Sequence, residues 1–245
     1  MFFKRKAILM IHGFVGGIYD FGSLHNELQL NKQFDVFTFT LPAHNQFIVN
    51  NVKHQEWLDE SINQIEFLMQ NGYKEIYLIG HSMGGVIAAY LASIYPQVKK
   101  LVLVAPAFRY FYFKEGKVDI KSFNETIKNI PEIFKGNNTE EVISRILKTP
   151  IPTMIEFTKL VNQCQDCVNV IECPTLTIHG TNDLIVPTEA TDYVYNSIKS
   201  KTNILVNIHK LNHECFVTKK SKEVKETITT FLKQSPKNKK ETIEL

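Results

Sequence analysis

Apolar runs of four to eight residues alternate with helix-length segments along this chain of 245 residues, and that alternation constrains the fold most. Runs of this length suit buried strands, and the segments between them suit crossover helices, so the pattern predicts an α/β fold with a mostly parallel sheet. The main helices are expected near 21–28, 54–70, 83–95, 188–198 and 221–232. The predicted strands are six: 7–11, 34–41, 76–79, 101–105, 175–178 and 204–208.

One interval breaks the alternation. About seventy residues, 106–174, separate the fourth run from the fifth and contain three further helical patterns, near 122–130, 139–147 and 153–168. A connection this long at the carboxyl end of a sheet indicates an inserted cap or lid. We therefore expect a core built from 1–105 and 175–234, the cap at 106–174, and a polar, flexible tail at 235–245.

Composition excludes several classes of protein. A hydrophobic fraction of 44%, a charged fraction of 22% and a net charge of +3 are ordinary for a globular domain and do not predict a nucleic-acid surface. No apolar run approaches the ~20 residues of a membrane helix, and the run at 7–11 is too short for a signal peptide. We expect a cytoplasmic protein that does not span a membrane. The sequence does not distinguish a monomer from a homodimer.

The four cysteines fit a reducing compartment better than a disulfide framework. Cys164 and Cys167 form a C-x-x-C pair, but Cys164 continues the helical spacing of Met154, Phe157 and Val161 and is expected in the core. Cys173 adds a third thiol without a fourth ligand at metal-like spacing. The sequence predicts no metal and no cofactor.

The pentapeptide Gly80-His81-Ser82-Met83-Gly84 joins the third predicted strand to a helix rich in small residues. A serine at such a sharp strand-to-helix turn is typical of a nucleophile elbow, in which flanking glycines avoid steric collisions. The helix N-terminus adds free N–H groups near the serine oxygen. Ser82 is therefore the candidate nucleophile. A glycine-rich turn capped by a serine without a catalytic role is the alternative, because it would have the same sequence pattern.

A serine hydroxyl needs a base, and the base needs a third group to fix its tautomer. Asp183 follows the fifth predicted strand and His213 follows the sixth, in the order Ser, acid, His that this architecture uses. Three parallel strand ends would bring them to one edge of the sheet. Asp192, inside a predicted helix, and His209, directly after a strand, are the alternatives.

An oxyanion hole is expected from two backbone amides. One belongs to Met83, directly after the serine, and the other to Phe14 in the loop His12-Gly13-Phe14-Val15-Gly16-Gly17 after the first strand. The glycines allow this loop to approach the serine closely. A glycine-rich phosphate loop is the alternative, but no P-loop lysine or G-x-G-x-x-G is present.

On these residues the chain resembles the α/β-hydrolase fold, and within it small bacterial carboxylesterases and monoacylglycerol lipases. The resemblance covers about 7–234 and implies ester hydrolysis through a serine acyl-enzyme without a cofactor. It also implies a six-stranded sheet, because the chain lacks room for the first two strands of the full fold. One departure is Leu41-Pro42-Ala43-His44-Asn45, where many relatives have Gly-His-Gly, so substrate preference does not transfer.

Aromatic residues at the start of the cap suggest an apolar wall for an acyl chain or aromatic ester. The run 108–113 is the densest in the chain and is followed by a hairpin-like turn at 114–117, and packing of the cap onto the core explains it equally well. The candidate substrate-binding residues are Phe14, Phe108, Tyr110, Phe111, Met154 and Phe157.

The sequence thus favours a serine hydrolase acting on a small ester with a short to medium acyl chain, or on a monoacylglycerol. A thioesterase, carbon–carbon hydrolase or lyase with the same triad is the alternative, because one fold hosts many reactions. A non-catalytic ligand-binding protein of the same fold is a further alternative.

Overall fold

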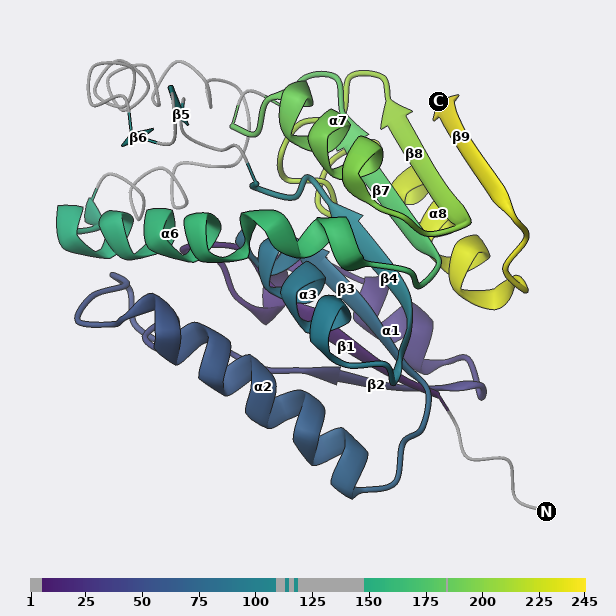
Figure 1. Ribbon diagram of the computed structural model, residues 1–245, viewed down its shortest axis with the longest axis horizontal. Helices are drawn as coiled ribbons and strands as arrows, with labels where there is room; N and C mark the ends of the chain where they lie inside the picture. Colours follow the sequence, from purple (N-terminus) through teal and green to yellow (C-terminus); the bar gives the residue numbers. More distant parts are fainter. Residues whose placement is uncertain (1–5, 109–112, 115–116, 119–147, 184) are drawn as a thin grey trace.

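The computed structural model describes residues 6–108, 113–114, 117–118, 148–183 and 185–245. Figure 1 shows a sheet with helices on both faces. The sheet has seven strands in the order β2-β1-β3-β4-β7-β8-β9, and every neighbouring pair is parallel. The strands are β1 (Lys6–Ile11), β2 (Phe34–Thr38), β3 (Ile76–His81), β4 (Val98–Val104), β7 (Thr175–Gly180), β8 (Thr202–Ile208) and β9 (Lys239–Glu244).

The central strands are buried on both faces, which explains their continuous apolar runs. Along β1, Leu9 and Ile11 pack into one hydrophobic cluster, while Ile8 and Met10 pack into the other. Because side chains alternate across a strand, an uninterrupted apolar run supplies both cores at once.

Two helix layers cover these faces (Figure 1). One layer holds α1 and α8, whose inward leucines, valine and isoleucine complete the smaller cluster. The other holds α2, α3, α6 and α7, and α3 is buried at its centre because it is apolar on nearly every side. The helices are α1 (Leu24–Gln29), α2 (His54–Gln70), α3 (Met83–Ile94), α6 (Ile151–Cys164), α7 (Thr188–Ser197) and α8 (Ser221–Lys233), with 3₁₀ turns η1 (Ile18–Phe21) and η2 (Gln165–Val170).

The prediction of six strands and a flexible tail was wrong at the C-terminus. Residues 239–244 form β9, which pairs in parallel with β8 at the edge of the sheet. The segment Lys-Lys-Glu-Thr-Ile-Glu has a single apolar residue, Ile243, which packs against the smaller cluster. An edge strand can remain polar on its solvent side, and charged residues there oppose edge-to-edge pairing, so hydrophobicity does not reveal it.

The interval expected to form the cap is described in part. Its last helix is α6, which ends at Cys164 and continues into η2. A two-stranded antiparallel hairpin, β5 (Phe113–Lys114) and β6 (Lys117–Val118), is found where the sequence predicts a hairpin turn. The helices expected near 122–130 and 139–147 lie outside the described residues, and the assignment of 106–174 as a lid stays a prediction.

Candidate active site

Ser82 occupies the turn between β3 and α3, with φ 53° and ψ −118°. Its amide donates to the Val104 carbonyl at 2.9 Å, and its own carbonyl accepts from Gly85 at 2.9 Å, so the strained backbone is held from both sides. A methyl group at Gly84 would collide with the Ile11 carbonyl, and one at Gly80 would collide with the Gly84 backbone. The glycines are therefore needed for the sharp turn that presents this serine.

The predicted acid and base are hydrogen-bonded to each other. Asp183 follows β7, His213 follows β8, and His213 Nδ1 lies 2.8 Å from Asp183 Oδ2. The second oxygen, Oδ1, accepts the amide N–H groups of Ile185 and Val186, both at 2.9 Å. The carboxylate is thus fully engaged, and its side chain has no exposed surface.

The charge states follow from these contacts. Burial alone would raise the pKa of Asp183, but the charge of His213 and the hydrogen bonds outweigh it and lower the pKa below its ordinary value. Burial likewise acts to lower the pKa of His213, and the charge of Asp183 outweighs it, so this pKa is raised. Because an ionised Asp183 only accepts, neutral His213 carries its proton on Nδ1 and leaves Nε2 as a base.

His81 connects the loop of His213 to the turn that carries Ser82, a contact that was not predicted from the sequence. Its Nε2 donates to the backbone carbonyl of His213 at 2.9 Å, and the two rings lie 5.0 Å apart. Burial lowers the pKa of His81 to about 3, so its ring stays neutral beside His213. The signal was available, since His81 sits inside the serine motif.

Within the described residues no hydrogen bond joins the Ser82 hydroxyl to the His213 ring, whose Nδ1 faces Asp183. Such contacts are often long in unliganded enzymes and tighten when substrate binds. The link between the two loops is the bond from His81 Nε2 to the His213 carbonyl. Among the described residues, neither alternative is hydrogen-bonded to Ser82 or to the other predicted partners. Asp192 lies inside α7, and His209 is exposed, with its amide bonded to Leu245.

The loop after β1 lies against the serine. A methyl group at Gly13 would stand 3.2 Å from the Ser82 Cβ. His12 fixes the loop because its Nε2 accepts the Leu41 amide at 3.0 Å and its Nδ1 donates to the Gly13 carbonyl at 2.9 Å. Neither the Phe14 amide nor the Met83 amide donates to another backbone group in the described ranges.

Four of the six candidate substrate-binding residues are described; three belong to one apolar cluster, and Phe14 packs against it. Phe14 stacks on Phe157, with ring centroids 5.0 Å apart and an interplanar angle of 12°. Phe108 and Met154 are buried in the same cluster. Tyr110 and Phe111 lie outside the described residues. Trp57, which is not among the residues predicted from the sequence, contacts Phe14 edge-on at 5.9 Å.

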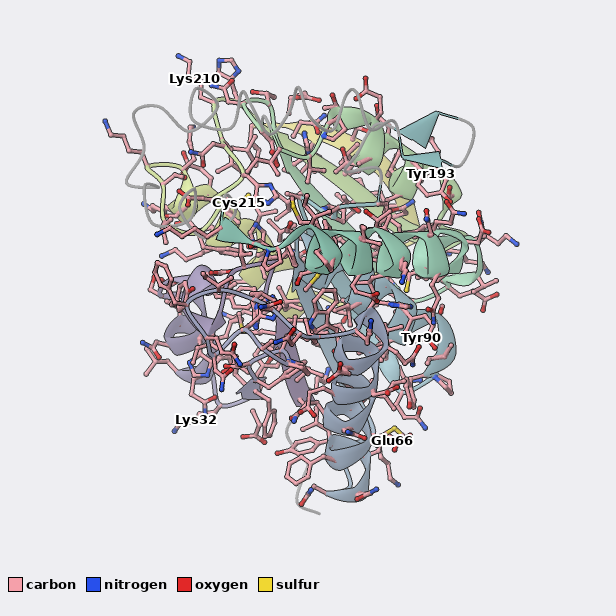
Figure 2. The ribbon with its side chains drawn as sticks, turned by 90° about the vertical axis from the view of Figure 1, so that its left-hand side faces the viewer. Lys32, Glu66, Tyr90, Tyr193, Lys210 and Cys215 are labelled. Carbon is pink, nitrogen blue, oxygen red and sulfur yellow. The ribbon has the colours of Figure 1, made fainter. Side chains whose placement is uncertain are left out.

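All four cysteines are free thiols, and none of them forms a disulfide. Cys164 is fully buried, as its helical spacing predicts, and burial raises its pKa to about 12. Cys215, two residues after His213, lies inside the molecule, whereas Lys210 lies at its edge (Figure 2). Among the described residues no cluster of three or more His, Cys, Asp and Glu side chains has metal-binding geometry.

None of the described helices combines the length and the apolar character that crossing a bilayer requires. A family model described as alpha/beta hydrolase fold matches residues 6–136, and one described as serine aminopeptidase S33 matches 123–220.

Individual proteins agree with the family match. A carboxylesterase of Bacillus subtilis (strain 168) is 24% identical, over 94% of this chain and 93% of its own length. A thermostable monoacylglycerol lipase of Bacillus sp. (strain H-257) is 22% identical, over 84% and 82%. A solved structure of one of the metagenome-derived lipolytic enzymes LipS and LipT superposes with a TM-score of 0.72 at 17% identity, covering 94% of each chain. The chain therefore belongs to the alpha/beta hydrolase fold family, as a hydrolase that resembles carboxylesterases and monoacylglycerol lipases.

Proposed function

We propose that this enzyme hydrolyses carboxylic esters through a triad of Ser82, His213 and Asp183. The single observation that carries the proposal is the hydrogen bond between Asp183 and His213 Nδ1. It fixes the tautomer in which Nε2 is free to accept a proton, on a loop that His81 ties to the serine turn.

In the proposed reaction, Ser82 Oγ attacks the ester carbonyl while His213 Nε2 takes its proton. The amides of Phe14 and Met83 donate hydrogen bonds to the negatively charged carbonyl oxygen that forms. His213 then protonates the departing alcohol, leaving an acyl-enzyme on Ser82. Water attacks that ester with His213 again as the base, and the acid and the free serine are released. In both steps His213 accepts the proton and returns it, and the two backbone amides stabilise the negative charge on the carbonyl oxygen.

Support for an apolar acyl portion comes from the side chains around the proposed oxyanion loop. Phe157 and Met154 belong to one hydrophobic cluster, and Phe14 packs against it with its ring stacked on Phe157. Phe14 is the partly exposed member of this group, and apolar side chains beside a reacting group are typical of sites that bind small apolar molecules. Short to medium acyl esters and monoacylglycerols fit this chemistry.

The test is a chain-length series of 4-nitrophenyl esters, from acetate to dodecanoate, together with a monoacylglycerol. The native protein should hydrolyse the shorter members, and Ser82→Ala should abolish turnover while the protein stays folded. An undiminished rate in Ser82→Ala would refute the proposal. Thioester and diketone substrates in the same panel distinguish the alternative reactions, because a thioesterase or carbon–carbon hydrolase would prefer them.

A further inference from the structure

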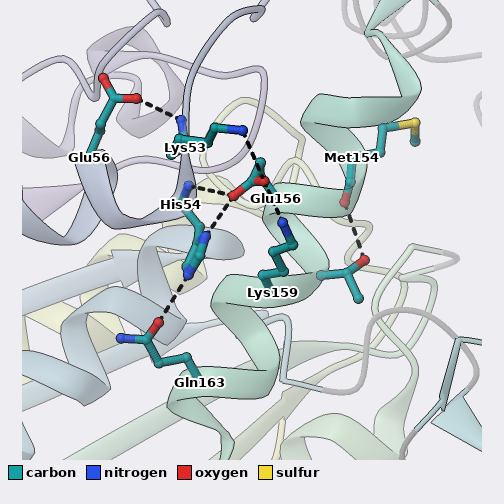
Figure 3. Close-up of polar contacts among 8 residues, drawn as sticks. Lys53, His54, Glu56, Met154, Glu156, Lys159 and Gln163 are labelled. Atoms are coloured by element: carbon teal, nitrogen blue, oxygen red, sulfur yellow. Dashed lines mark hydrogen bonds and ion pairs between the residues drawn. The ribbon is translucent and has the colours of Figure 1, made fainter.

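A buried carboxylate joins α6 to the start of α2. Glu156, on α6, is 5% exposed and lies among three basic groups (Figure 3). Its Oε2 accepts from His54 Nδ1 at 2.6 Å, and its Oε1 accepts from Lys159 at 2.8 Å. Lys53 Nζ lies 3.8 Å from Oε1. On the far side of the imidazole, His54 Nε2 lies 3.0 Å from Gln163 on α6.

The same carboxylate also serves as the cap of α2. The residue before this helix, Lys53, makes no side-chain cap, and the first helical amide, that of His54, donates instead to Glu156 Oε2 at 3.1 Å. A negative group at a helix N-terminus is favoured both by the free N–H groups and by the helix dipole. Burial raises the pKa of Glu156, but the bonds from Lys159 and His54 outweigh it and hold the pKa at about 2. The glutamate is therefore ionised at neutral pH.

Both helices present an aromatic ring to the proposed oxyanion loop directly beside this contact. Phe157, next to Glu156, stacks on Phe14 at 5.0 Å. Trp57, three residues after His54, meets the same ring edge-on at 5.9 Å. The Glu156–His54 bonds therefore join α2 to α6 beside the two rings that contact Phe14.

We propose that Glu156 is a positioning residue for ester hydrolysis. Its bonds to His54 fix α6 against α2, so that Phe157 and Trp57 hold Phe14 in place. This inference rests on the proposed function, because it assigns the Phe14 amide to the oxyanion hole. Glu156 touches no reacting atom. Its effect reaches the transition state through the Phe14 backbone, and a displacement of an ångström at a catalytic group can cost about 100-fold in rate.

The experiment compares native protein with Glu156→Gln, which keeps the shape of the side chain and removes its charge. His54→Gln is a second variant, which removes the ring contact but keeps the backbone N–H. Glu223→Gln is the matched control, because Glu223 lies on α8, in the opposite helix layer, and forms a partly exposed ion pair with Lys220 at the start of that helix. Active sites are counted with a fluorophosphonate, and kcat, KM, Tm and the Ki of an alkyl boronic acid are measured. The boronic acid forms a tetrahedral adduct with serine that needs the same oxyanion donors.

For Glu156→Gln we expect kcat per active site to fall about tenfold and the boronic acid Ki to rise by a similar factor, with KM within threefold of native. His54→Gln should show a smaller change of the same kind, and Glu223→Gln none. If Glu156→Gln lowers Tm while kcat per site and Ki stay within twofold of native, the residue is only structural and the inference is wrong. If Glu156→Gln does not fold, an unchanged kcat and Ki in His54→Gln would overturn it equally. A native protein that neither hydrolyses esters nor labels at Ser82 would instead remove the proposed function itself.

Discussion

Replacing Asp183 by asparagine should abolish most activity by reversing a single hydrogen bond. In the native protein Oδ1 accepts two amide N–H groups, from Ile185 and Val186, so the oxygen of an asparagine amide must take that place. Its NH₂ group then occupies the position of Oδ2 and donates to His213 Nδ1. The His213 proton is forced onto Nε2, which can no longer accept the proton of Ser82.

The magnitude follows from that tautomer change, because volume and packing are almost unaltered. Holding the histidine in the wrong tautomer costs about 10⁴-fold in kcat, or about 5.4 kcal/mol at 1.36 kcal/mol per tenfold. The assay is steady-state hydrolysis of 4-nitrophenyl butyrate, with circular dichroism and Tm confirming that the variant is folded. Asp192→Asn is the matched control, since Asp192 is an exposed residue of α7, and its rate should stay native. A fall of less than tenfold in Asp183→Asn, or an equal fall in both variants, would refute the reasoning.

Further predictions concern pH, the serine turn and stability. Because the pKa of His213 is raised, the neutral ring that can act as a base predominates only at a pH above 6.5. The acid limb of the kcat/KM profile should therefore have its midpoint above pH 6.5. A flat profile from pH 5 to 8 would contradict the assignment of His213 as the base. His81→Ala removes the bond to the His213 carbonyl, and we expect about a tenfold loss of kcat with KM nearly unchanged. His81→Gln should recover part of the lost kcat. A native kcat in His81→Ala would exclude a role for His81 in positioning His213. The buried ammonium of Lys100 donates to three carbonyls at the end of α8. Lys100→Met leaves them without this donor and should lower the free energy of unfolding, measured in urea, by about 3 kcal/mol. A decrease below about 1 kcal/mol would show that these bonds contribute little to stability. Deleting 239–245 exposes the edge of β8 and should lower Tm and promote association seen by light scattering. An unchanged Tm without increased scattering would show that β9 does not protect this edge.

The sequence is most informative where local rules and global topology coincide. The elbow at Ser82 combines a buried strand, two glycines that backbone contacts require and a helix of small residues, so a short motif identifies the turn. Asp183 and His213 are predictable because parallel strands carry successive loops to one edge of a sheet, and their hydrogen bond follows that prediction.

Features that depend on distant partners are not visible in this way. Glu156 and His54 are 102 positions apart, and each by itself resembles an ordinary surface charge until α6 packs on α2. β9 carries one apolar residue, so its pairing with β8 leaves no hydrophobic pattern. His81 belongs to the serine motif and is easily found in the sequence. The backbone carbonyl that it binds depends on how the loop after β8 folds back, which the motif does not specify.

The central claim is that Ser82 is a nucleophile activated at this edge of the sheet, and labelling tests it most directly. The protein is treated with a fluorophosphonate at pH 8, and intact mass and peptide mass spectrometry then locate the adduct. We predict one adduct per chain, on the peptide that contains Ser82, with loss of ester hydrolysis in proportion to labelling and no adduct on Ser82→Ala. An adduct on a different residue, or full ester hydrolysis by a protein labelled at Ser82, would contradict it.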